Sequence, residues 1–225
     1  MDLTLENLPT IDLVKHSQQE TATFSMGYFW TPEAIFGATE GVIRTRVGYA
    51  GGQSSDPTYR NMGDHIETVQ LDFNPEIISF SKLLNIFFQH HTPTKEPRKR
   101  QYASALFYHA AAQQTQIKQA IKAAEEKFDQ PILTEVLPLQ GFYLAEERHQ
   151  KWKLRRATAV LQELQRIYPD FEKFNKSTVV ARVNGYLSGF GDKGLVMEEI
   201  GSLGLSSPVQ QMLLAHYLTQ ENPLV

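Results

Sequence analysis

The stretch FSMGYFWTPEAIFGATEGVIRTRVGYAGG, residues 24–52, decides the fold of this chain. Its first residues have the pattern of a strand end, and a helix is expected directly afterwards. Thr31 is the expected N-cap and Pro32 suits the first helical position, because its missing N–H would have no partner there anyway. The helix is expected to end at Gly41. Tyr28 therefore lies at the positive end of a helix, where a nucleophile or an anion is stabilised.

Apolar periodicity and turn residues predict the other elements. Strands are expected over residues 21–26, 42–49, 65–73, 103–108 and 132–139, and helices over 31–40, 79–90, 111–128 and 207–218. Ser79 is the expected cap of the second helix, and residues 184–191 are interpreted as a glycine-rich turn region. Strands interleaved with helices predict an α+β fold, a two-layer sandwich of a mixed sheet with helices.

The chain divides into three parts in this interpretation. Residues 1–21 form an N-terminal arm with a helical turn, residues 22–154 form the main domain, and residues 155–225 form a C-terminal helical extension packed on the core. The extension has periodic apolar residues, so its composition is not that of a disordered tail.

Composition excludes several classes of protein. With 225 residues, 41% apolar residues and a net charge of −3, the chain has ordinary globular values and no bias toward nucleic acid or an anionic membrane surface. No apolar run approaches the roughly 20 residues of a membrane span, so a cytoplasmic protein is expected. The basic cluster at 151–156 is interpreted as the solvated face of a helix. The absence of cysteine excludes disulfides, thiolate metal sites and thiol nucleophiles.

Five short motifs occur in a characteristic order and spacing. They are Gly27-Tyr28-Phe29-Trp30, Val47-Gly48-Tyr49-Ala50-Gly51-Gly52, Pro57-Thr58-Tyr59-Arg60, Asp64-His65-Ile66-Glu67 and Gln101-Tyr102-Ala103-Ser104. In this set, which extends over about residues 22–152, the chain resembles the peptide methionine sulfoxide reductase A family. The resemblance implies the family's fold, methionine sulfoxide in proteins or peptides as ligand, thioredoxin or another thiol as reductant, and no cofactor or metal.

The chain differs from the family at the residue that carries the reacting atom. The family has a cysteine nucleophile where this chain has Tyr28, whose phenol has an ordinary pKa of about 10. A phenolate is a hard oxygen nucleophile, and its adduct with the substrate offers a thiol no route to release methionine. Catalysis through a thiolate of this chain is therefore chemically excluded.

The rest of the family site is present. By resemblance, Phe29 and Trp30 form the pocket for the methyl group, Glu67 is the buried acid that protonates the sulfoxide oxygen, and Tyr59 and Tyr102 hydrogen-bond that oxygen. The physical chemistry agrees, because a sulfoxide oxygen is a strong acceptor and two phenols and a protonated carboxyl are suitable donors.

Other polar residues near these motifs are interpreted as structural. Glu67 alternates with Ile66, so one of the two is expected to face inward. His65 lies on the same strand face as Glu67 and is interpreted as a hydrogen-bonded structural histidine, and a metal site that combines it with His90-His91 has little support. His149 is expected on a helix surface.

Three readings of the function remain. The first is an inactive relative that retains at most a methionine or methionine sulfoxide-binding or scaffold role, with a protein partner for the C-terminal extension. The alternative is a methionine-(S)-sulfoxide reductase whose nucleophile was changed in this copy. Oxygen-nucleophile or metal chemistry has the least support. We also hypothesise that Tyr28 plugs the site, with its hydroxyl bonded to Glu67, or to Tyr59 and Tyr102.

Overall fold

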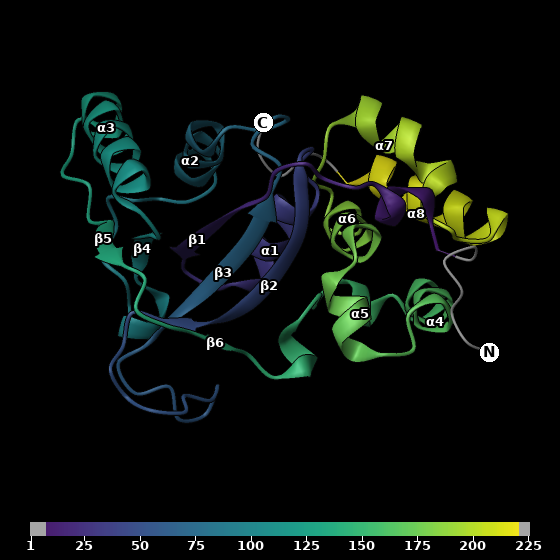
Figure 1. Ribbon diagram of the computed structural model, residues 1–225, viewed down its shortest axis with the longest axis horizontal. Coiled ribbons are helices and arrows are strands. Elements are labelled where there is room, and N and C mark those ends of the chain that lie inside the picture. The colour runs from purple at the N-terminus through teal and green to yellow at the C-terminus, as the bar shows by residue number, and fades with distance from the viewer. Residues whose placement is uncertain (1–7, 221–225) are drawn as a thin grey trace.

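One mixed six-stranded sheet organises residues 8–220, which are the residues that the computed structural model describes (Figure 1). The strand order is β5-β4-β1-β3-β2-β6. The strands are β1 Glu20–Met26, β2 Val42–Ala50, β3 Ile66–Phe73, β4 Ser104–Tyr108, β5 Glu135–Pro138 and β6 Phe142–Leu144. All neighbours pair antiparallel except β4 and β5, which are parallel. The α+β class predicted from the sequence is confirmed.

Three helices share the main core with this sheet. They are α1 Trp30–Gly37, α2 Phe80–Gln89 and α3 Ala111–Phe128. Side chains from all three helices join β1, β2 and β3 in one cluster of buried apolar residues. The bounds of α3 agree with the prediction, and Ser79 caps α2 as predicted, because its hydroxyl accepts from the Lys82 N–H at 3.2 Å.

Helix α1 begins one residue earlier than predicted. Its flanking residue is Phe29, whose carbonyl accepts from the Glu33 N–H at 3.0 Å, so Thr31 is not the N-cap. The Phe29 N–H instead donates to a carboxylate oxygen of Glu67 on β3, at 3.2 Å. An acidic side chain from a distant strand therefore satisfies a free N–H at the start of the helix, which local sequence does not reveal.

The central strand β3 is buried on both faces, since all eight of its residues are buried. Ile66 packs in a second apolar cluster with Ala105 and Phe107, while Glu67 reaches the start of α1 on the opposite face. The expectation that only one of Ile66 and Glu67 faces inward is therefore wrong. The alternation is real, but protein covers both sides of this strand.

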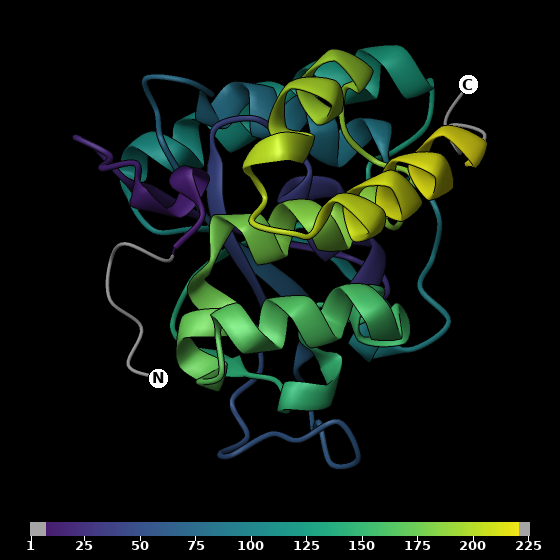
Figure 2. The same ribbon diagram turned by 90° about the vertical axis from the view of Figure 1, so that its right-hand side faces the viewer.

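In the part of the chain that the structure describes, five α-helices follow the sheet. They are α4 Thr158–Ile167, α5 Phe171–Lys176, α6 Thr178–Tyr186, α7 Lys193–Glu199 and α8 Ser207–Thr219. They gather at one end of the molecule (Figures 1 and 2) and have a separate apolar cluster that includes Ala38 from the end of α1. Helix α6 lies directly against α1, since a Cβ on Gly37 would be 2.5 Å from the Ala181 carbonyl oxygen. The division of the chain at residue 154 remains a prediction.

Two local predictions in this region are wrong. Helix α6 runs to Tyr186, so the first residues of the expected turn region at 184–191 are helical, and Gly185 provides the close approach to α1. The basic cluster at 151–156 is not a solvated helix face. Lys151 is fully buried and its ammonium donates to Glu33, because that carboxylate lies at the centre of the same interface.

The N-terminal arm is described from residue 8 onward, and residues 1–7 lie outside the described residues. It contains the expected helical turn, a short 3-10 helix over Thr10–Leu13. Asp12 accepts from the Thr178 N–H at 2.7 Å and from the Ser177 hydroxyl at 2.6 Å, so the arm is fastened to the start of α6. None of the helices within residues 8–220 has the length and apolarity needed to cross a membrane.

Candidate functional site

Tyr28 lies in the two-residue link between the end of β1 and the Phe29 cap of α1. The preceding Gly27 has φ 86°, a left-handed conformation that glycine adopts without strain. The Tyr28 side chain is 56% exposed. Its ring centroid is 4.5 Å from that of Tyr102 and 6.3 Å from that of Trp30, to which it is nearly parallel. The phenol therefore lies at the mouth of the site.

Tyr28 covers the entrance of the site, so the hypothesis of a plugged site is correct for the entrance only. Glu67 accepts hydrogen bonds from the Phe29 N–H and from the Gln101 side-chain amide, each at 3.2 Å. Among the described residues no hydrogen bond joins the Tyr28 hydroxyl to Glu67. Tyr28 instead interacts with Tyr102, whose pKa it helps to raise, as the second form of the hypothesis expects. Tyr28 partly covers the site and does not fill its interior.

Glu67 has the environment expected of an acid that can donate a proton. Its side chain is 1% exposed, and burial raises the pKa of its carboxyl to about 7, against the opposing effect of its two hydrogen bonds from Phe29 and Gln101. Near neutral pH a large fraction of this carboxyl is therefore protonated. A protonated carboxyl can donate to a sulfoxide oxygen, whereas an ionised one only accepts.

Two phenols remain protonated beside this acid. Burial raises the pKa of Tyr59, and the Glu67 charge adds to the effect. Burial likewise raises the pKa of Tyr102 to about 12, with added contributions from Glu67, Tyr59 and Tyr28. Both hydroxyls are thus available as donors at neutral pH. The structure brings Tyr59, Tyr102 and Glu67 together as the motifs predict.

Phe29 and Trp30 place aromatic rings beside these polar groups. Phe29 is 1% exposed and its ring packs 6.1 Å from that of Tyr49, while Trp30 is half-buried. Trp30 stacks on Trp152 with 4.6 Å between ring centroids, and the Arg156 guanidinium lies 3.7 Å from the centre of the Trp152 ring. Trp152 was not among the predicted site residues; an aromatic residue within the basic cluster at 151–156 was the available signal.

His149 is buried beside the site and is not on a helix surface as expected. Its side chain is 7% exposed, and its ring lies 4.4 Å from the Tyr59 ring and 5.9 Å from Trp30. The prediction failed because the segment after β6 forms only a short 3-10 helix, Glu147–His149, which turns this side chain inward. Burial lowers the pKa of His149, so its ring is neutral at pH 7.

Glu146 is a positioning residue that the sequence analysis missed. Its carboxylate accepts from the Tyr49 hydroxyl at 2.7 Å and from the Tyr59 N–H at 3.2 Å. It therefore ties the Tyr59 loop to β2 and to the segment that carries His149. In the sequence, the run of acidic residues and histidine at 146–149 was the feature that could have indicated Glu146.

His65 is a structural histidine, as predicted. It is 1% exposed, its Nδ1 accepts from the Gly52 N–H at 3.2 Å, and its Nε2 lies 2.8 Å from the Ser54 carbonyl oxygen. Within residues 8–220 no three His, Asp or Glu side chains are grouped so that they could hold a metal ion.

Comparisons with known proteins agree with this architecture. A family model described as "PMSR: Peptide methionine sulfoxide reductase" matches residues 20–182. A Drosophila melanogaster "Peptide methionine sulfoxide reductase" is 41% identical over 203 residues, which are 89% of this chain and 80% of that protein. An Acidobacterium capsulatum "Peptide methionine sulfoxide reductase MsrA" is 42% identical over 61% of this chain and 96% of its own length.

Solved structures show the same relationship. Reduced Mxr1 from Saccharomyces cerevisiae aligns with a TM-score of 0.59 at 27% identity, over 64% of this chain and 90% of that one. Methionine sulfoxide reductase A of Corynebacterium diphtheriae aligns with a TM-score of 0.59 at 28% identity, over 64% of this chain and 77% of that one.

The chain therefore belongs to the peptide methionine sulfoxide reductase family. The family match also extends past residue 154, so part of the C-terminal helical region belongs to it.

Proposed function

We propose that this chain binds methionine sulfoxide side chains of proteins or peptides and does not reduce them through a nucleophile of its own. One combination of features carries the proposal. The side chain at the nucleophile position is a phenol and the chain has 0 cysteines, while the other groups expected to bind a sulfoxide are present at the same site. The separate role of a partner-binding surface on residues 155–225 remains a prediction.

The binding chemistry follows from the donors and the apolar wall. The sulfoxide oxygen accepts from the phenols of Tyr59 and Tyr102 and from the protonated carboxyl of Glu67. The methyl group packs against Phe29 and Trp30. Methionine has no comparable acceptor, so it would leave the buried Glu67 carboxyl and the partly buried phenols without this partner, and the site discriminates in favour of the oxidised side chain.

The alternative is a reductase whose nucleophile was changed in this copy. It is supported by the placement of residue 28 at the start of α1, where the N-terminal end of a helix lowers the pKa of a thiol. Restoring the thiol tests both readings, because the sulfoxide-binding groups are already in place.

The experiment compares the unmodified chain with Tyr28→Cys and Tyr28→Ser. Isothermal titration calorimetry with a peptide that contains methionine-(S)-sulfoxide, and with its methionine counterpart, measures binding. We expect the unmodified chain to bind the oxidised peptide more tightly and to show no turnover with dithiothreitol. Tyr28→Cys is expected to reduce the sulfoxide, while Tyr28→Ser, which opens the mouth equally without a thiol, is not.

The pH dependence of the Tyr28→Cys variant tests Glu67 as the proton donor. Because burial raises the pKa of Glu67 to about 7, kcat/KM is expected to fall about tenfold per pH unit above that value. Adding Glu67→Gln is expected to lower it by about 10²- to 10⁴-fold and to remove that limb of the profile. Turnover by the unmodified chain overturns the proposed inactivity, and absence of binding by the unmodified chain overturns the binding role.

A further inference from the structure

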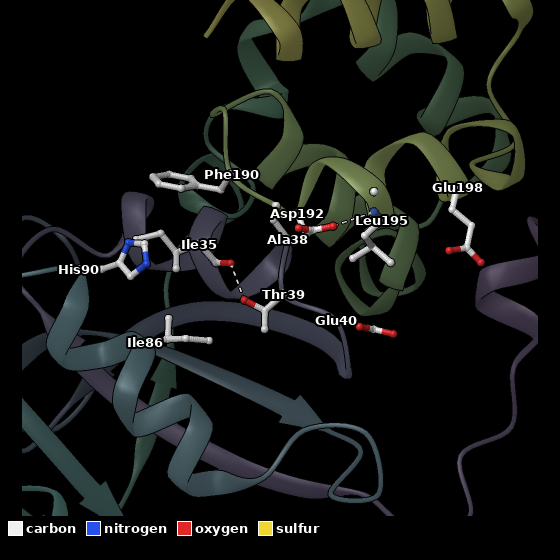
Figure 3. Close-up of a pocket in the computed structure, with 12 residues that line it drawn as sticks. Ile35, Ala38, Thr39, Glu40, Ile86, His90, Phe190, Asp192, Leu195 and Glu198 are labelled. Carbon is white, nitrogen blue, oxygen red and sulfur yellow. Dashed lines mark hydrogen bonds between the residues drawn. The ribbon is translucent and has the colours of Figure 1, made fainter. Parts of the chain in front are cut away.

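A cavity of about 650 Å³ lies at the end of α1 that is remote from Tyr28, between α1, α2 and the segment that begins α7 (Figure 3). The carboxyl groups of Glu40 and Glu198 at its edge belong to exposed residues. Asp192 caps α7, because its carboxylate accepts from the Leu195 N–H at 3.1 Å. Water and the helix therefore satisfy these carboxyl groups, and they do not select a ligand.

A second cavity, of about 320 Å³, adjoins the candidate site itself. Tyr28 and Tyr102 line it, together with the loop that follows α2 and with Ser104 at the start of β4. Tyr102 is also one of the two phenols beside Glu67, so the cavity and the site share a wall. Consecutive Cα atoms of a peptide are about 3.8 Å apart. The neighbours of a methionine sulfoxide bound at the site therefore come within reach of this cavity.

The loop that lines this cavity is strongly basic. Residues 95–100 read Lys-Glu-Pro-Arg-Lys-Arg, in a chain whose net charge is −3. Lys95 and Arg98 line the cavity, and Glu96 is the one acidic residue among the described residues that do so. In the described part of the chain no carboxylate, that of Glu96 included, lies within salt-bridge distance of Lys95 or Arg98. Their charges are therefore available to a bound anion.

The basic loop is held at both ends. The Pro93 carbonyl accepts from the Leu133 N–H at 2.8 Å, and the Lys99 carbonyl accepts from the Tyr102 N–H at 3.0 Å. Arg100 forms an ion pair with the first residue of β5, so its charge is neutralised and it fastens the loop to the sheet. Because the backbone is already fixed, a ligand does not have to order the loop when it binds.

His91 lines the same cavity but adds no charge to it. Its Nδ1 lies 2.7 Å from the Phe87 carbonyl oxygen, and its Nε2 lies 2.9 Å from the Ser104 hydroxyl. Burial lowers the pKa of His91 to about 4, so the ring is neutral at pH 7. The electrostatic preference of the cavity therefore comes from Lys95 and Arg98.

We infer that this cavity binds a carboxylate of the peptide, the side chain of an aspartate or glutamate within two residues of the methionine sulfoxide. The Arg98 guanidinium has paired N–H donors that match a carboxylate, and Lys95 adds a second positive charge. The inference rests on the sulfoxide-binding function proposed above and names the peptides that the site prefers, those in which the oxidised methionine lies in an acidic sequence.

Three peptides test this preference by titration calorimetry with the unmodified chain. Each has a central methionine-(S)-sulfoxide, flanked on each side by two aspartates, two asparagines or two lysines. At about 20 mM salt the aspartate peptide is expected to bind about three- to tenfold more tightly than the asparagine peptide, and the lysine peptide more weakly than both. In 1 M sodium chloride, where the screening length is about 3 Å, the preference for aspartate is expected to fall below about twofold.

Variants of the loop locate the carboxylate. Lys95→Gln and Arg98→Gln are each expected to weaken binding of the aspartate peptide about two- to fivefold, and to change binding of the asparagine peptide by less than about 1.5-fold. Lys99→Gln is the matched control, because Lys99 is exposed in the same loop and does not line the cavity. It is expected to weaken binding of the aspartate peptide by less than about 1.5-fold.

The outcomes separate this inference from the function on which it rests. Equal affinities for the aspartate and asparagine peptides overturn the inference, and so does a preference that Lys95→Gln and Arg98→Gln leave unchanged. The proposed function stands in both cases, provided that the asparagine peptide binds more tightly than its unoxidised counterpart. Absence of binding by all three sulfoxide peptides overturns the proposed function, and this inference with it.

Discussion

Replacing Lys151 with methionine is expected to be among the most damaging single changes in this protein. The Lys151 ammonium donates to the Glu33 carboxylate at 2.7 Å, to the Thr45 carbonyl at 2.7 Å and to the Asn175 side-chain oxygen at 2.8 Å. Its N–H also donates to Glu33, at 2.7 Å. These contacts join α1, β2 and α5 at a point where both Lys151 and Glu33 are 0% exposed.

The expected magnitude follows from this burial. Methionine keeps the length of the side chain but leaves the Glu33 carboxylate without its cation, and breaking a buried pair in this way costs about 3–5 kcal/mol. A protein of ordinary stability, about 5–15 kcal/mol, would lose a large part of it. Replacing both partners with neutral residues removes the unpaired charge, so the double variant Glu33→Gln/Lys151→Met is expected to recover about 2 kcal/mol.

Urea unfolding of the two single variants and the double variant, monitored by circular dichroism, measures the coupling. Lys176→Met is the matched control, because Lys176 pairs with Glu172 at the surface, where the side chains are 55% and 73% exposed. That change is expected to cost less than about 0.5 kcal/mol. A loss below about 1 kcal/mol for Lys151→Met, or no recovery in the double variant, would refute the reasoning.

Two further predictions concern Glu67 and the contact between α1 and α6. Because burial raises the folded-state pKa of Glu67 from 4.5 to about 7, the folded protein holds this proton between those pH values and loses stability as pH rises through them. Glu67→Gln removes this dependence. In urea titrations, the free energy of unfolding of the variant minus that of the unmodified chain is therefore expected to rise by about 2–3 kcal/mol from pH 5 to pH 8. Gly37→Ala is expected to cost about 1–3 kcal/mol, because its Cβ would lie 2.5 Å from the Ala181 carbonyl oxygen. Gly201→Ala, which has no atom within 4 Å of the added carbon, is the control, and equal thermal stability of the two variants would contradict tight helix packing.

The sequence predicted most elements of the main domain because their signals are local. The apolar spacing of α3 and the serine before α2 need no tertiary information, and the structure agrees with both. Strand β6, which has only three residues, is too short to show a period, and it forms by pairing with β2. Such an element depends on a partner that local patterns do not identify.

The predictions for Lys151 and His149 were wrong for the same physical reason. A lysine within a run of basic residues is normally exposed, and only the Glu33 carboxylate, 118 residues away in sequence, makes its burial favourable. His149 is turned inward by a short 3-10 helix and packs on Tyr59, which belongs to a separate loop. The motifs identified the members of the site correctly as neighbours, whereas the side chains that hold them, such as Glu146, depend on the folded arrangement.

The site geometry explains why an exchange at position 28 can leave the rest intact. Glu67 is held by the backbone N–H of Phe29 and by the Gln101 amide, and neither group belongs to the Tyr28 side chain. The Tyr28 ring is more than half exposed and lies at the rim of the site, against Tyr102 and Trp30. A residue of any size that fits this rim therefore leaves the acid and its pKa largely unchanged. The side chain at position 28 and the burial and hydrogen bonds of Glu67 are thus structurally independent, so Tyr28→Cys is expected to give turnover.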